Sequence, residues 1–308
     1  MRPIGEGRVV LAAGSGFLGQ SLARELTDRG YEVVILTRSA NGVPTTGRAV
    51  LWDGKTVGDW VSAVDGAEAV VNLAGKNVNC RYTRKNLREI DESRVDSVRA
   101  IAEAVRRSAR PPRVWVQAGT LAIYGDRGQK LCDETTPPGE GIPVQTAMAW
   151  EQAFQANPTP QTRRVLLRIS FALGTGGGAL ATLTALTRRF LGGRIASGRQ
   201  YISWIHLADL NRMFVWAIER DDIEGVFNAT APHPVTNATF MGELRRVLGR
   251  PWSPPVPGWA VRLGAFFLRT EPVLALTGRR GIPTRFIDKG FEFEHPELPA
   301  ALENVFAD

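Results

Sequence analysis

The feature that most constrains this 308-residue chain is an apolar segment leading through a glycine-rich turn into an amphipathic helix. The segment reads Arg8-Val-Val-Leu-Ala-Ala-Gly-Ser-Gly-Phe-Leu-Gly19. We expect a strand over Val9–Ala13, a helix over Phe17–Arg29 and a second strand over Glu32–Thr37. This order predicts the βαβ unit of a dinucleotide-binding fold.

Three glycines in the turn have the spacing G-x-G-x-x-G. Gly16 lacks a Cβ, so its backbone can lie against a pyrophosphate, and Gly19 allows the helix to pack closely on the strand. The N–H groups at the helix start then face the anion. We predict that the whole turn contacts the cofactor: Gly14, Ser15, Gly16, Phe17, Leu18 and Gly19. The alternative is an ordinary structural turn.

The end of the second strand indicates which dinucleotide is bound. An NAD-binding unit usually has a carboxylate there to accept a hydrogen bond from the ribose 2′-OH. This chain has Thr37, Arg38 and Ser39 instead. Because a guanidinium matches the geometry of a phosphate, the sequence favours NADP(H) over NAD(H). The alternative is a solvated arginine at the end of a strand.

Strand and helix patterns continue to alternate after Thr37. Further strands are expected at Arg48–Trp52, Ala69–Gly75, Arg113–Ala118 and Arg164–Ser170, with helices at Val57–Val64, Arg84–Arg107 and Ala147–Ala156. Such alternation predicts an α/β, Rossmann-type doubly wound parallel sheet with helices on both faces.

The pattern changes after Ser170. A glycine run at Gly174–Gly178 precedes an expected helix over Ala179–Leu191, a strand-like segment over Gly198–His206 and a helix over Leu207–Arg220. The chain beyond is rich in proline and glycine. We assign residues 1–170 and 202–230 to the Rossmann core. Residues 171–201 and 231–308 are assigned to a smaller substrate region that closes over the cofactor.

Composition excludes several classes of partner. The net charge is +7, but acids alternate with bases where the bases are densest, as on a solvated helix, so we expect no nucleic acid. No stretch approaches the apolar length of a membrane span, and we expect no membrane partner. The first strand follows the N-terminus directly, which leaves no room for a signal peptide. Cys80 and Cys132 are isolated, which favours a reducing cytoplasm and no metal site.

Short runs across nearly the whole chain resemble one known group of proteins. These runs are Gly14–Gly19, Leu36–Arg38, Asn72–Gly75, Ser93-Arg94, Tyr124–Gly128, Trp150-Glu151, Leu173–Ala179, Ser197–Gln200, Ser203–His206, Asn228–Pro232, Pro234–Asn237 and Gly290–Phe293. The chain resembles the extended short-chain dehydrogenase/reductase superfamily, specifically its epimerase-family proteins with a distinctive C-terminal domain.

The resemblance implies an NADP(H)-binding Rossmann domain and assigns further cofactor contacts. It places Thr37 and Arg38 at the adenosine phosphate, and Leu73 and Ala74 against the adenosine and ribose. Two more residues are placed near the phosphates and near the nicotinamide, respectively: Arg94 and Ala172. A solvated helix arginine is the alternative for Arg94.

Two positions depart from the superfamily pattern. Ala13 replaces the first glycine of the turn, so we expect this position to avoid positive φ and Gly14 to absorb the strain. The superfamily's catalytic tyrosine and lysine correspond here to Pro143 and Ala147, which can neither move a proton nor tune the pKa of a neighbour.

The remaining chemistry falls on few side chains. Thr120 matches the hydroxyl residue that orients the substrate in active relatives, with an exposed loop threonine as the alternative. Tyr124 is the best remaining acid/base candidate, with packing at the base of the pocket as its alternative. For His206, a structural hydrogen bond is favoured over catalysis.

Two functions therefore stay open. One is an NADP-dependent oxidoreductase or epimerase with a non-standard acid/base group, acting on a small carbonyl or hydroxyl substrate. The other is a catalytically degenerate NADPH-binding sensor. Either would be a monomer or a homodimer.

Overall fold

The computed structural model describes residues 7–39, 46–267 and 269–307. Seven strands, all parallel, form the central sheet in the order β11-β7-β5-β4-β1-β2-β3. Their bounds are Arg8–Ala12 (β1), Glu32–Thr37 (β2), Arg48–Leu51 (β3), Ala69–Asn72 (β4), Val114–Thr120 (β5), Arg163–Ile169 (β7) and Gly225–Ala229 (β11). The predicted doubly wound α/β fold is confirmed. Strand order reverses between β1 and β4, which is where such sheets bind ligands.

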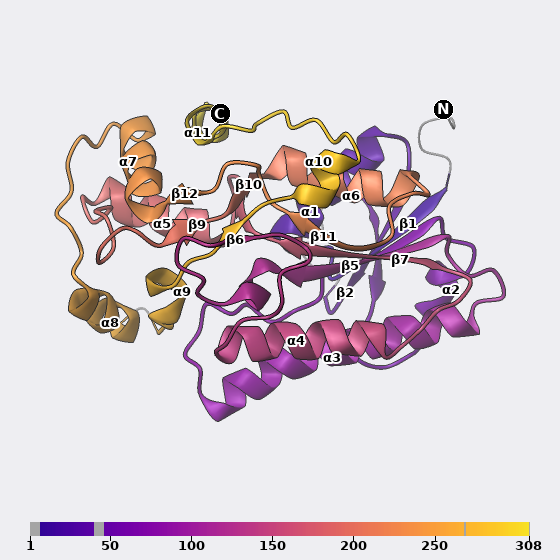
Figure 1. The fold of residues 1–308 in the computed structure, drawn as a ribbon. Coiled ribbons are helices and arrows are strands. Elements are labelled where there is room, and N and C mark those ends of the chain that lie inside the picture. Colours follow the sequence, from indigo (N-terminus) through magenta and orange to yellow (C-terminus); the bar gives the residue numbers. More distant parts are fainter. Residues whose placement is uncertain (1–6, 40–45, 268, 308) are drawn as a thin grey trace.

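Helices cover both faces of this sheet (Figure 1). Helices α1 (Phe17–Asp28) and α6 (Leu207–Glu219) pack on one face. The other face carries α2 (Val61–Val64), α3 (Arg84–Arg107) and α4 (Ile142–Gln155). Buried aliphatic side chains from alternate positions of the strands fill the two layers between sheet and helices, as the period of a strand requires.

Helix α4 begins five residues before its predicted start at Ala147. Pro143 lies in its first turn, where the missing N–H has no helical partner to lose and the fixed φ suits the helix. The predicted start at Ala147 placed this proline outside the helix, and that boundary is wrong.

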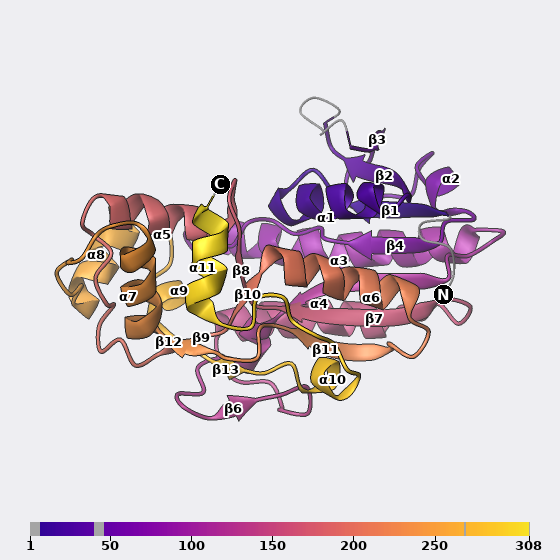
Figure 2. The ribbon, with the colours of Figure 1, turned by 90° about the horizontal axis from the view of Figure 1, so that it is seen from above.

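Most of the remaining elements gather beyond one end of the sheet, whereas α10 (Thr284–Asp288) packs beside β11 (Figures 1 and 2). The remaining elements are η1 (Leu121–Tyr124), β6 (Leu131–Cys132), β8 (Phe171–Leu173), α5 (Gly178–Arg188), β9 (Tyr201–Ile202), β10 (Trp204–His206), β12 (Val235–Thr236), α7 (Asn237–Val247), α8 (Gly258–Phe267), α9 (Val273–Leu276), β13 (Arg280–Gly281), α10 (Thr284–Asp288) and α11 (Leu298–Phe306).

A separate hydrophobic cluster joins α5, α7 and α11 to strands β8 and β10. Phe286 and Phe291, although late in the chain, pack in the core beside the central sheet. The proposed division into two regions stays a prediction. No helix in the described part of the chain is long and apolar enough to cross a membrane.

Candidate cofactor site

The three glycines of the turn between β1 and α1 do different work. A Cβ on Gly19 would lie 2.5 Å from the Cα of Gly14, and one on Gly14 would lie 2.8 Å from the Leu11 Cβ. A Cβ on Gly16 would have only the Ala13 carbonyl oxygen near it, at 3.8 Å, and Gly16 is exposed. Gly14 and Gly19 therefore allow the turn to pack. Gly16 leaves an open backbone surface that a phosphate can approach, so the residues present fit a dinucleotide.

Ala13 does not avoid positive φ, as the sequence analysis expected. Its φ is +58°, and Gly14 is not among the described residues with positive φ. The left-handed residue thus comes directly after β1, where the Ala13 N–H still donates to the Leu36 carbonyl across the sheet (2.9 Å). Gly14 is required for space rather than for φ. A Cβ in this conformation costs about 1 kcal/mol.

Strand β2 ends in hydroxyl groups and a cation. Thr37 is buried, and its Oγ1 lies 3.0 Å from the Ser39 carbonyl oxygen and 3.3 Å from the Ser15 Oγ of the glycine turn. Arg38, next in the chain, is exposed. The end of β2 is therefore tied to the turn and carries no carboxylate that would repel a 2′-phosphate.

A buried asparagine shapes the end of β4. The Asn72 side chain donates to the Gln117 Oε1 (3.0 Å) and the Ser97 Oγ (3.2 Å), and its Oδ1 accepts from the Ala74 N–H (3.0 Å). The Leu73 N–H donates to the Ala12 carbonyl (3.0 Å). These bonds hold Leu73 and Ala74 at the point where strand order reverses. No site role was predicted for Asn72, although a polar amide within an otherwise apolar strand could have indicated one.

Arg94 is not a solvated helix arginine. Its Nη1 donates to the carbonyls of Lys76 (3.1 Å) and Ile90 (3.0 Å), and its guanidinium lies 4.9 Å from the centre of the Trp150 ring. Burial lowers the pKa of Arg94. A Cβ on Gly75 would lie 3.1 Å from the guanidinium carbon. Arg94 thus supports the loop after β4, and its contact with phosphates stays a prediction.

Two residues were predicted near the nicotinamide, and both lie close to the carboxyl end of a strand of the central sheet. Thr120 ends β5, and its Oγ1 accepts from the Ala122 N–H (3.1 Å), capping η1. Ala172 lies in β8 and pairs with Ile205 of β10. Both positions follow the carboxyl ends of sheet strands, and their roles stay predictions.

The positions of the missing catalytic pair lie on α4. Pro143 is in its first turn, and Ala147 is buried. Ala147 packs in an apolar cluster with Leu121, Ile123, Tyr124 and Cys132. The Ala147 side chain thus packs among apolar groups and the Tyr124 ring and offers no group that could move a proton.

Tyr124 is fully buried, and its hydroxyl is surrounded by partners. It accepts from the Arg168 Nη1 (2.9 Å) and lies 2.7 Å from the Asp133 carbonyl oxygen and 2.8 Å from the Asn228 Oδ1. Burial raises the pKa of Tyr124 to about 12, although Arg168 and Asn228 oppose the shift. This geometry favours the packing alternative over the acid/base role.

The Arg168 guanidinium is itself held by a buried carboxylate. Its Nε and Nη2 donate to the two carboxylate oxygens of Glu151, each at 2.9 Å. Asn228 extends the network, since its Nδ2 donates to the Ile282 carbonyl (2.9 Å). The network joins η1, α4, β7, β11 and the segment before α10. Sequence reasoning missed it because its members are far apart in the chain.

A cavity of ≈ 460 Å³ lies between α1, the loop after β8, α6 and α11. Its lining includes Phe17, Gln20, Arg24, Asn211, Asn304 and Val305. His206 borders it, and its Nδ1 accepts from the Ala208 N–H (3.2 Å), capping α6. The His206 ring lies 3.9 Å from the His295 ring, centre to centre. His206 thus makes the structural hydrogen bond that the sequence favoured.

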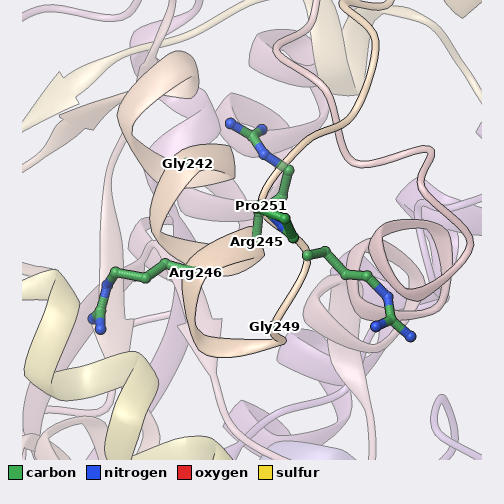
Figure 3. A pocket seen from close by; sticks show the side chains of 6 residues that line it. Gly242, Arg245, Arg246, Gly249 and Pro251 are labelled. Carbon is green, nitrogen blue, oxygen red and sulfur yellow. The ribbon is translucent and has the colours of Figure 1, made fainter.

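A second hollow, of ≈ 390 Å³, lies at the carboxyl end of α7 and contains three arginines. The Arg246 side chain points away from that of Arg245 (Figure 3), and Arg246 pairs with Glu243 and Glu303 at 2.7 and 2.8 Å. The Arg245 Nη1 donates to the Gly192 carbonyl (2.8 Å). These cations do not converge on a common point and are engaged elsewhere, so this hollow is not the cofactor site. Among residues 7–39, 46–267 and 269–307, no group of three or more His, Cys, Asp or Glu side chains can hold a metal ion.

Comparison with known proteins assigns the family. The model of the NAD-dependent epimerase/dehydratase family matches residues 9–229, and that of a domain of unknown function, DUF1731, matches residues 256–305. The chain belongs to the NAD-dependent epimerase/dehydratase family. The predicted resemblance to epimerase-family proteins with a distinctive C-terminal domain is thereby confirmed.

Relatives within the epimerase/dehydratase family match along their whole length. Human epimerase family protein SDR39U1 is 34% identical over 97% of this chain and 100% of its own. Epimerase family protein YfhF of Bacillus subtilis is 32% identical over 97% of this chain and 98% of its own. The crystal structure of human SDR39U1 (isoform 2) with NADPH superposes with a TM-score of 0.88 at 32% identity, covering 98% of this chain and 99% of that one.

The two family models divide the site unevenly. The glycine turn, β2, β4, Thr120 and Tyr124 all fall in the epimerase/dehydratase match. The cavity residues Asn304 and Val305 lie on α11, at the end of the DUF1731 match. The C-terminal domain thus contributes a wall beside the glycine turn.

Proposed function

We propose that this protein binds NADP(H) and acts as an oxidoreductase or epimerase on a small carbonyl or hydroxyl substrate. The observation that carries the proposal is the open Gly16 backbone at the reversal of strand order, beside a strand that ends in Thr37 and Arg38 without an acid. The NADPH in the human SDR39U1 structure supports it.

The chain's own groups would divide the cofactor between them. Backbone N–H groups within the turn Gly14–Gly19 would hold the pyrophosphate, and Thr37 and Arg38 would hold the adenosine phosphate. The N–H groups of Gly14 and Gly16 already donate to the Leu11 and Ala13 carbonyls, so the main donors would be the other residues of the turn. Leu73 and Ala74 give the adenosine an apolar surface. Bound NADP(H) supplies or accepts a hydride.

The substrate side uses fewer groups than in a standard dehydrogenase. Thr120 orients the substrate through its hydroxyl. Tyr124 supports the base of the substrate pocket, because Arg168 holds its hydroxyl. Its raised pKa makes loss of the phenol proton near neutral pH even less favourable than in a free tyrosine. Since neither Pro143 nor Ala147 transfers protons, the accompanying proton comes from water or from a group on the substrate.

Fluorescence titration with NADPH, and in parallel with NADH, tests the cofactor. Eight tryptophans make quenching by the reduced nicotinamide easy to follow. We expect NADPH to bind at least tenfold more tightly than NADH. Binding of neither, by a folded protein, would overturn the proposal.

A carbonyl substrate screen with NADPH then tests turnover. We expect Thr120→Val to lose activity with unchanged NADPH affinity. If Tyr124 acts chemically, Tyr124→Phe will abolish turnover without lowering the melting temperature. If Tyr124 only supports the base of the pocket, the same variant will have a lower melting temperature.

A second candidate is an NADPH sensor without turnover. The apolar environment of Ala147 favours it, since neither Pro143 nor Ala147 provides a proton-transfer group there. The two candidates separate cleanly by experiment. A sensor would become more compact with NADPH in small-angle scattering yet consume none with any carbonyl substrate.

The remaining expectations accompany the proposal. Cys80 and Cys132 are free, which suits a reducing compartment such as the cytoplasm. Light scattering on the purified protein would decide between monomer and homodimer.

A further inference from the structure

Helix α8 presents an apolar face to solvent. Trp259, Leu263, Phe266 and Phe267 are between 52% and 74% exposed, and their spacing of i, i+4, i+7 and i+8 places them on one side of the helix. Trp252, just before α8, is 66% exposed. We call the four side chains on α8 the α8 patch. Surface helices normally turn such a stripe toward the core.

The helix is fixed in this orientation by the loop that precedes α3. The Arg81 guanidinium lies 4.3 Å from the centre of the Phe266 ring, and its Nη2 donates to the Phe266 carbonyl (3.3 Å). The Tyr82 N–H donates to the Glu271 Oε1 (2.6 Å), and Thr270 donates to Asn79. Ala265, on the opposite side of α8, is buried. Arg81 thus contacts one ring of the patch, while the four apolar side chains of α8 all remain more than half exposed.

Cations border the patch. Arg262 and Arg269 are exposed on α8 and just after it. Between Pro251 and Thr277 the chain has one acid, Glu271, whose carboxylate is bound by the loop before α3. Through that loop the patch adjoins the start of α3.

The first turn of α3 holds Arg84 and Lys85, both exposed, and no acid. Cations at a helix N-terminus oppose the helix dipole and cost stability. Lys85 is engaged within the helix by Glu89 (3.9 Å), so the cations that border the patch itself are Arg262 and Arg269.

We propose that the α8 patch docks this protein on an anionic lipid surface. Tryptophan and phenylalanine enter the boundary between headgroups and acyl chains, while the surrounding cations face the acidic headgroups. A second copy of the chain fits less well, because two-fold pairing would bring the same cations together. Helix α8 lies at one end of the molecule, so a flat bilayer reaches it without meeting the sheet (Figures 1 and 2). A helix that lies on the surface needs no membrane span, so this proposal revises the expectation of no membrane partner.

Vesicle co-sedimentation of the full chain tests the proposal. We expect binding to vesicles of phosphatidylcholine with phosphatidylserine, and at least about tenfold weaker binding to phosphatidylcholine alone. Raising the salt above about 0.15 M should weaken it further. Leu263→Glu with Phe267→Glu should abolish binding.

Three further variants separate the contributions. Arg262→Gln with Arg269→Gln should weaken binding by about fivefold per charge, with unchanged melting temperature, because both side chains are exposed. Leu51→Glu is the matched control, because Leu51 is 64% exposed but lies on β3 at the edge of the sheet, and it should bind like the unaltered protein. Brominated lipids should quench tryptophan fluorescence in the unaltered protein and less in Trp259→Phe.

Three results would overturn the proposal. One is no binding of the unaltered, folded protein to either vesicle. Another is equal binding of the Leu263→Glu, Phe267→Glu variant. The third is self-association in analytical ultracentrifugation that this variant removes, without vesicle binding, which would assign the patch to a second copy.

Discussion

The glycine turn after β1 and the first turns of α4 serve the two halves of the proposed site in opposite ways. The turn works through missing side chains, since Gly16 exposes backbone and Gly19 makes room for Gly14. The start of α4 would need two specific side chains, and it has Pro143 and Ala147 in their place. The cofactor half is thus complete as backbone geometry, whereas the chemical half lacks the functional groups that the standard mechanism requires.

The largest expected effect comes from removing the buried carboxylate of Glu151, which holds Arg168 beneath the chemical half of the proposed site. Glu151→Ala leaves the buried Arg168 charge without its carboxylate and should cost about 3–5 kcal/mol of unfolding free energy. Urea unfolding measures this loss. The exposed pair partner of Arg246, Glu303, gives the control, because Glu303→Ala should cost less than about 1 kcal/mol. Equal losses would mean that the buried pair contributes nothing special.

The cofactor half should break at Gly16 without loss of fold. A Cβ there meets no protein atom closer than 3.8 Å, and the backbone is extended at φ −80°, so Gly16→Val should keep its melting temperature. We expect at least about a 100-fold loss of NADPH affinity, or ~2.8 kcal/mol. Gly19→Ala should do the reverse, losing stability through its 2.5 Å contact with Gly14. Unchanged NADPH affinity in Gly16→Val would place the cofactor elsewhere.

Cofactor choice sharpens the comparison further. Arg38→Ala should weaken NADPH binding about 10- to 100-fold (~1.4–2.8 kcal/mol) and leave NADH binding unchanged. Parallel titrations with the two nucleotides measure the ratio. A parallel loss for both would show that Arg38 contacts a part they share.

A pH titration probes the contact between α6 and the C-terminal segment. Burial, and then the neighbouring His295, lower the pKa of His206 from 6.5 to about 4, while Asp209 opposes the shift. The unfolded chain therefore binds more protons than the folded protein between these values, and stability should fall as the pH drops from 6.5 to 4. We expect a loss of about 1 kcal/mol after allowance for partial solvent screening.

His206→Asn keeps a cap for α6 without a titrating ring, so its melting temperature should depend less on pH over this range. His233→Asn, at an exposed histidine, is the control and should retain the full dependence. The same slope in all three proteins would exclude His206 as the source.

The smallest expected effect concerns the turn itself. Ala13→Gly relieves a positive φ and should stabilise the protein by about 0.5–1 kcal/mol, less the entropy that glycine adds to the unfolded chain. Differential scanning calorimetry with and without NADPH measures it. A destabilised variant would show that the Ala13 methyl makes a contact worth more than the strain.

Local patterns predicted much of the fold. Strand β2 and helix α3 match their predicted bounds, because apolar runs and a capping Thr83 mark them within a few residues. The start of α4 was predicted too late, because a proline such as Pro143 stops a helix in its interior but suits its first turn. The positive φ of Ala13 was not predicted, because φ there depends on where the chain must reverse.

The unpredicted parts of the site rest on contacts between distant segments. Asn72 meets Gln117, and Tyr124 meets Arg168 and Asn228, only after the strands are aligned. The exposure of the apolar side chains of α8 was likewise not predictable, because the loop before α3 contacts this helix only in the folded chain. Periodicity identifies an apolar stripe but not the direction in which it points.

Helix α11 completes a wall beside a turn made at the other end of the chain. During synthesis the glycine turn leaves the ribosome early, yet the cavity next to it has no outer wall until residues 298–306 have followed. A shortened product that lacks these residues can still form the central sheet while missing that wall. Nucleotide affinity would then report whether α11 is present, which bulk secondary structure would not reveal.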